Sequence, residues 1–258
     1  MRLDGLLMRG GWYPSRTPLN SALSKSHLGY DEESDVNAIV PLVCDYTSAS
    51  YARIATLWQQ VRYLDRYAIA GALVECGVWK GGTVATMALA HLKSFSKPTR
   101  RIHLFDSFEG LPEPRAMDGD EALLLSGGKK SGAMRSINQY AASAEISRNL
   151  LVKELGYPEN LLSYHPGWFE KTVPNSGARI GPIALLRLDG DWYESTKICL
   201  ENLYDAVVPN GVVVVDDYGH FTGCRQAVDE FIAGLTHPIM LNYIDYSARY
   251  WIKPDRRA

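Results

Sequence analysis

The sequence predicts an α/β fold with a doubly wound, mostly parallel sheet and an antiparallel hairpin at its C-terminal edge. Short apolar runs alternate with helical patterns along most of the chain, which is the order of elements that such a sheet requires. The runs at 184–186 and 212–215 are apolar throughout, as expected for parallel strands covered on both faces. Two final runs, 239–244 and 248–252, flank Asp245-Tyr246-Ser247 and predict the hairpin.

Each element follows from a local pattern. The first amphipathic helix is expected at 51–67, where apolar residues recur three and four positions apart from Ile54 to Leu64. Strands are expected at 72–76, 101–105, 161–164, 183–188 and 211–215, and further helices at 82–94, 142–155, 194–206 and 223–234. Residues 106–140 fit neither pattern, and a loop of that length in a compact domain is often a lid over a site.

The chain divides into an arm and one domain. Residues 1–45 lack a sustained pattern and carry Gly10-Gly11, Pro14 and Pro18, so we expect an irregular arm or lid that includes at most a short helix. Residues 46–258 have the length of one large α/β domain with a sizeable core.

The composition excludes several classes of protein. A net charge of −2 gives no electrostatic footprint for nucleic acid. No apolar run approaches the roughly 20 residues of a membrane span, and the apolar part of the N-terminus is too short for a signal peptide. The cysteines are widely scattered, which fits a reducing compartment better than a disulfide framework. We therefore expect a soluble cytoplasmic protein.

The first candidate site is a glycine turn after the first expected strand. Glu75 ends the strand, Gly77 starts the turn, and a helix follows Gly81-Gly82. Glycines let the backbone approach a ligand, and a helix N-terminus offers free N–H groups to a carboxylate or phosphate. The GxxxGG spacing differs from the GxGxxG dinucleotide fingerprint, which disfavours a dehydrogenase. A tight turn with no ligand also fits this pattern.

Two weaker signals accompany the glycine turn. Asp106 ends the second expected strand, where acidic residues hold ribose hydroxyls in Rossmann-like folds. Asp at a strand end is often only a turn former, however. The run 165–169 places Trp168 and Phe169 after a glycine, where the two rings either wall a ligand or plug the edge of the sheet.

Two pairs of aspartates carry the clearest chemical signal. Asp189 and Asp191 follow one apolar strand, and Asp216 and Asp217 follow the next. Four carboxylates facing one cleft repel one another, and a hard cation such as Mg²⁺ relieves that repulsion. Helix N-caps explain one acid in each pair but not two. Arg187 either balances these acids or points to solvent.

Taken together, these motifs resemble the macrocin O-methyltransferase family from about Thr47 to Trp251. The resemblance rests on the motifs ECGVWKGG, DSFEGLP, PGWF, RLDGDWY and DDY followed by Cys224-Arg225. It implies S-adenosylmethionine as methyl donor, Mg²⁺ held by Asp189, Asp216 and Asp217, and Asp191 as general base. The donor-binding residues that we expect are Thr47, Glu75, Gly77, Val78, Trp79, Gly81, Gly82, Asp106, Ser107 and Trp168.

The resemblance also implies the reaction and the partners. The acceptor is expected to be a hydroxyl of a rhamnose-like deoxysugar, in a glycoside or a nucleotide sugar, in natural-product or surface-glycan biosynthesis. Relatives are commonly homo-oligomers, and their N-terminal segments close over the substrate. No nucleic-acid partner and no membrane span are expected.

The main alternative is a metal-dependent glycosyltransferase. Asp189-Gly190-Asp191 resembles the DxD motif that holds a metal-bound nucleotide sugar in that class of enzyme. This alternative leaves the glycine turn without a role.

Overall fold

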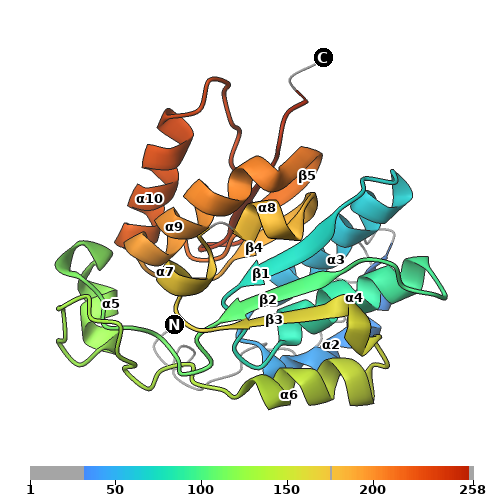
Figure 1. Cartoon of the computed structure of the whole chain (residues 1–258), viewed down its shortest axis with the longest axis horizontal. Helices are drawn as coiled ribbons and strands as arrows, with labels where there is room; N and C mark the ends of the chain where they lie inside the picture. Colours follow the sequence, from blue (N-terminus) through green and yellow to red (C-terminus); the bar gives the residue numbers. More distant parts are fainter. Residues whose placement is uncertain (1–31, 175, 256–258) are drawn as a thin grey trace, which may run out of the picture.

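The computed structural model describes residues 32–174 and 176–255, and in these residues it forms a mixed sheet flanked by helices (Figure 1). The strands are β1 (Ala72–Cys76), β2 (Ile102–Asp106), β3 (Leu162–Pro166), β4 (Ile183–Leu188), β5 (Val207–Val215), β6 (Asn242–Tyr243) and β7 (Arg249–Ile252). The helices are α2 (Glu33–Val43), α3 (Tyr51–Arg66), α4 (Gly82–Ser94), α5 (Asp120–Leu125), α6 (Ala144–Arg148), α7 (Phe169–Thr172), α8 (Ser176–Ile180), α9 (Tyr193–Leu203) and α10 (Thr222–Ala233).

The order of the strands confirms the predicted fold. It runs β3-β2-β1-β4-β5-β7-β6, with the first five strands parallel and β7 antiparallel to both of its neighbours. The chain builds outward from β1 to β3 and then returns to β4 on the other side of β1. Ligands bind at the carboxyl ends of the strands on either side of such a switch point.

Helices cover both faces of the sheet, which explains the unbroken apolar runs. Figure 1 shows α7, α8, α9 and α10 on one face and α2, α3, α4 and α6 on the other. Alternate strand residues enter different cores: Leu185 packs with the α3–α4 side and Leu186 with the α9–α10 side. Burial on both faces therefore selects apolar residues at every position of the central strands.

Several predicted elements differ from the observed ones. β5 begins at Val207, earlier than predicted, because its pairing with β4 shifts register around a segment that holds Pro209 and Gly211. Proline and glycine are unusual inside a strand, so the sequence pattern predicts a turn at these residues. The helix expected at 142–155 is α6 followed by a π-helical stretch, Asn149–Glu154, which buries two consecutive leucines. In the C-terminal hairpin, β6 is only two residues long.

Two segments predicted to be irregular are structured. Within 106–140 the chain forms a short 3₁₀ helix, Ala116–Asp118, then α5, and two isolated β-bridges. The buried Glu113 holds Arg135 at 2.5 Å. The described part of the predicted arm forms α2, whose Val36 and Val43 lie in the main core. Residues 33–43 thus pack with the domain, and the rest of the predicted 1–45 arm up to residue 31 lies outside the described residues.

No helix in the described ranges is both long and apolar enough to cross a membrane.

A buried ion-pair network ties α3 and α4 to β2 at the amino ends of the strands. Asp65 accepts from His91 Nδ1 at 2.9 Å and from Arg100 Nε at 2.7 Å. His91 Nε2 accepts from two backbone amides, so its proton resides on Nδ1. Burial raises the pKa of Asp65, but hydrogen bonds from His91 and Arg100 outweigh it and hold the pKa below its ordinary value.

We expect Asp65→Ala to lower the free energy of unfolding by about 3–5 kcal/mol, because it leaves a buried guanidinium unpaired. Since the pKa is lowered on folding, the ionised carboxylate stabilises the fold above its ordinary pKa. This stabilisation is lost as pH falls through the folded-state value. Urea titrations at neutral and acidic pH test this, and the deficit should shrink in acid.

Lys93→Ala is the matched control, since Lys93 pairs with Asp35 in an exposed ion pair. It should cost about 1 kcal/mol at most. An Asp65→Ala deficit that stays constant down to acidic pH would contradict the electrostatic account.

Candidate active site

The predicted site residues meet at the carboxyl ends of the central strands. The glycine turn follows β1, Asp106 ends β2, Asp189 and Asp191 follow β4, and the second aspartate pair follows β5. Asp189 N donates to Cys76 O at 2.8 Å, so the aspartate loop lies directly against the glycine turn. One edge of the sheet therefore holds both predicted sites.

The carboxylate of Asp106 closes the glycine turn. Its Oδ2 accepts from Val78 N at 2.6 Å and Trp79 N at 2.9 Å, and its Oδ1 accepts from Phe108 N at 2.6 Å. Burial raises the pKa of Asp106, while these three amides act in the opposite direction. A carboxylate offers about four acceptor sites. Asp106 therefore keeps about one for a ligand.

Gly77 is required where the two sites touch. Its φ is +93°, and a Cβ there would lie 1.8 Å from the carbonyl oxygen of Asp189. Gly82 serves packing in the same way, because a Cβ would lie 2.8 Å from Cβ of Thr47. The glycine spacing thus follows from close backbone approach, which the GxxxGG pattern alone does not reveal.

The other predicted donor residues have local contacts of their own. Thr47 Oγ1 accepts from Ala49 N at 3.0 Å, and Ser107 Oγ donates to Gly110 O at 2.8 Å. Trp168 stands at the start of α7, directly after β3, and its carbonyl accepts from Lys171 N and Thr172 N. These contacts fix the local backbone at each of the three positions.

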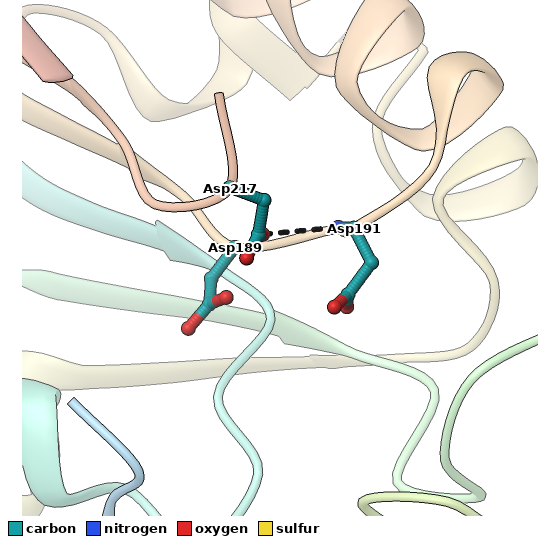
Figure 2. Close-up of side chains that lie close together, drawn as sticks. All are labelled: Asp189, Asp191 and Asp217. Atoms are coloured by element: carbon teal, nitrogen blue, oxygen red, sulfur yellow. Dashed lines mark hydrogen bonds between the residues drawn. The ribbon is translucent and has the colours of Figure 1, made fainter. Parts of the chain in front are cut away.

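Three of the four aspartates form an acid cluster, Asp189, Asp191 and Asp217 (Figure 2). One carboxylate oxygen from each lies within 4.8 Å of the others. Asp191 N donates to Asp217 Oδ2 at 3.3 Å, and Asp191 has a strained φ of +58°. Burial and mutual repulsion raise the pKa of all three carboxyls. Such a group is able to hold a cation or to take up a proton.

Asp216, by contrast, is engaged by two arginines. Its Oδ1 accepts from Arg187 Nη2 at 2.5 Å, and its Oδ2 pairs with Arg53 of α3. The structure thus groups Asp191, not Asp216, with the other two acids. The assignment of Asp216 to a metal stays a prediction.

Arg187 is a buried cation inside the site. Besides Asp216 it contacts Glu75 Oε1 at 2.6 Å and Asp189 Oδ2 at 2.9 Å. Burial raises the pKa of Glu75 to about 7, an effect that Arg187 and the Thr83 hydroxyl partly offset. Glu75 Oε2 is buried and has no hydrogen-bond partner in the described structure.

Arg53 and His220 lie at the site but are not among the predicted site residues. Arg53 is 163 residues from Asp216 in the chain, and one arginine on an amphipathic helix gives no signal of such a partner. The exposed His220 pairs with Glu121 of α5 at 3.1 Å and packs its ring on Tyr246. It therefore links the 106–140 segment to the rim of the site.

We expect Gly77→Ala to lower the free energy of unfolding by about 3 kcal/mol or more, because it combines a positive φ with a backbone clash. Gly128→Ala is the control, since Gly128 also has a positive φ, +84°, but no atom within 4 Å. It should cost about 1 kcal/mol. Urea unfolding measures both, and equal losses would contradict the role of the Asp189 contact.

The chain matches proteins of established activity. The family model for macrocin-O-methyltransferase matches residues 20–253. A tetracenomycin rhamnosyl 4'-O-methyltransferase of Streptomyces olivaceus is 34% identical over 212 residues, 80% of this chain and 75% of that one. Demethyldecarbamoylnovobiocin O-methyltransferase of Streptomyces niveus is 34% identical over 207 residues, with the same coverage.

A solved structure agrees with these relatives. The O-methyltransferase NovP superposes with a TM-score of 0.70 at 32% identity, covering 81% of this chain and 83% of its own. The glycosyltransferase alternative is therefore wrong. The chain belongs to the macrocin O-methyltransferase family and is an O-methyltransferase.

Proposed function

We propose that this O-methyltransferase transfers a methyl group from S-adenosylmethionine to a hydroxyl of a rhamnose-like deoxysugar, with Mg²⁺ held at the acid cluster. The observation that carries the proposal is the direct contact between the glycine turn and the acid cluster, through Gly77 and Asp189. The names of the relatives, which include a rhamnosyl 4'-O-methyltransferase and mycinamicin III 3''-O-methyltransferase, support the acceptor class.

The acid cluster fits a divalent cation. Mg²⁺ takes oxygen ligands and is usually bound through one or two carboxylates and several waters. Asp189 and Asp217 supply two such carboxylates, and their raised pKa reflects a repulsion that a cation would remove. We therefore assign the metal to these two residues and treat Asp216 as an anchor for Arg187 and Arg53.

The glycine turn fits a cationic, hydroxyl-rich donor. Glu75 Oε2 is a buried acceptor without a partner in the described structure, and Asp106 keeps about one free acceptor position. Thr83, in the first turn of α4, donates to the other oxygen of Glu75, Oε1, at 2.5 Å. These groups suit the ammonium and ribose hydroxyls of S-adenosylmethionine.

The residues of the chain then have separate tasks. When bound, S-adenosylmethionine supplies an electrophilic methyl group and Mg²⁺ supplies Lewis-acid stabilisation of an oxygen anion. Asp191 takes the proton of the acceptor hydroxyl. Its pKa is raised by burial and by Asp189, toward the range that suits a general base. Arg187 holds Glu75 and Asp189 in fixed positions behind the reacting groups.

Two expectations about the cellular context remain proposals. All four cysteines are free thiols, in agreement with a reducing, cytoplasmic compartment. A homo-oligomer is expected from the family, and light scattering of the purified protein would test it.

Calorimetry with S-adenosylmethionine is the first test, followed by methylation of rhamnosides with and without Mg²⁺. We expect heat with the donor, methyl transfer with the metal, and little transfer in chelator. No heat with the donor would refute the proposal, and full activity in chelator would refute the metal assignment.

Aspartate variants separate the assigned roles. Asp191→Asn should lower kcat by about 100-fold to 10,000-fold but keep Mg²⁺ and donor binding. Asp189→Asn and Asp217→Asn should each weaken Mg²⁺ binding by roughly tenfold or more. Loss of a residue that only orients a metal ligand already costs about tenfold in metal affinity, and loss of a ligand should cost at least as much. Calorimetric Mg²⁺ titrations and initial rates measure the difference.

Asp216→Asn is the matched control at the neighbouring position. It should keep Mg²⁺ binding and instead lose about 3–5 kcal/mol of stability, because two arginines lose a partner. Loss of Mg²⁺ binding in this variant would restore Asp216 to the metal.

A further inference from the structure

Two exposed tyrosines lie at the edge of the sheet that holds the acid cluster, one against Trp79 of the glycine turn and one in the turn before β7, which pairs with the end of β5. Tyr140 ends the 106–140 segment and is 44% exposed, and Tyr246 lies in the turn between β6 and β7 and is 59% exposed. A tyrosine ring beside a polar site offers a ligand a large apolar surface together with a hydroxyl.

Tyr140 packs against the glycine turn. Its ring packs edge-on against Trp79 of the glycine turn, with ring centroids 5.5 Å apart. Both residues have positive φ, +53° and +48°, which is strained for non-glycine residues. Burial, and then the carboxylates of Asp191 and Asp189, raise the pKa of Tyr140 to about 12, in agreement with a ring beside the cluster.

Tyr246 lies over Arg53 and beside the loop after β5. Its ring centroid lies 5.9 Å from the guanidinium of Arg53, which also pairs with Asp216. Gly219 allows the close approach of this turn, because a Cβ there would lie 1.9 Å from Tyr246 O. Ser247 Oγ donates to Asp216 O at 2.7 Å. The turn is therefore anchored to the strand that carries Asp216 and Asp217.

We propose that the rings of Tyr140 and Tyr246 are the two walls of a subsite that binds the pyranose ring of the acceptor. The inference rests on the proposed function and names the residues that select a sugar. The C–H bonds of a pyranose face carry partial positive charge and pack against the negative faces of aromatic rings. Its hydroxyls then point toward the acid cluster between the walls.

Exposure alone does not define these walls, and two other tyrosines serve as matched controls. Tyr67 is 65% exposed at the end of α3, at the opposite edge of the sheet. Tyr243 is 66% exposed on β6, and its ring packs under Arg249 at 4.5 Å. Neither ring should contribute to binding of the acceptor sugar.

Saturation-transfer NMR tests the subsite, with methyl α-L-rhamnopyranoside as probe in the presence of S-adenosylhomocysteine and Mg²⁺. The wild-type protein should transfer saturation to the ring protons of the sugar. Tyr140→Ala and Tyr246→Ala should weaken sugar binding by about threefold to tenfold each, the range measured for single aromatic contacts. Tyr140→Phe and Tyr246→Phe keep the ring and should bind normally, as should Tyr67→Ala and Tyr243→Ala.

Three results would overturn the inference. They are no saturation transfer to the sugar in the wild-type protein, unchanged sugar binding in both alanine variants at the walls, and equal weakening in the controls. Calorimetry with S-adenosylhomocysteine should be unchanged in every variant, and its loss in Tyr140→Ala would place that ring in the donor site instead. Sugar binding is read without methyl transfer, so failure of the proposed reaction remains distinguishable from failure of the subsite.

Discussion

The site depends on one buried cation, Arg187. A buried guanidinium is tolerated only when its charge is paired, and here the partners come from the ends of three adjacent strands: Glu75 of β1, Asp189 after β4 and Asp216 after β5. The same contacts let three acids stay close together. Arg187 therefore fixes the relative positions of the end of β1 and both aspartate loops.

The site carries more carboxylates than guanidiniums, and this excess of negative charge suits a divalent cation. Five carboxylates meet there, counting Glu75, against the two guanidiniums of Arg187 and Arg53. The excess of negative charge falls on the acid cluster, whose carboxyl pKa values are all raised. Arg187 and Arg53 thus pair with Glu75, Asp189 and Asp216, and the remaining negative charge lies in the acid cluster.

Local patterns in the sequence were sufficient for the sheet and the positions of the acids, since strand ends and glycine turns are encoded within a few residues. These local patterns were insufficient to predict which basic residue pairs with each acid. Arg53 and Asp216 are 163 residues apart in the chain, and no local sequence pattern around either residue predicts that they form an ion pair. The 106–140 segment was misread for the same reason, because buried polar residues such as Glu113 and Asp118 hold it in place.

The geometry of transfer follows from backbone contact more than from side chains. Gly77 and Asp189 touch because β1 and β4 are neighbours at the switch point, and their register places the end of one strand against the loop of the other. Any donor held by the glycine turn then lies beside any acceptor held by the acid cluster. Tyr140 and Tyr246 belong to connecting segments outside this contact. With the proposed subsite, these segments are able to change and select a different acceptor while the sheet keeps the glycine turn against the acid cluster.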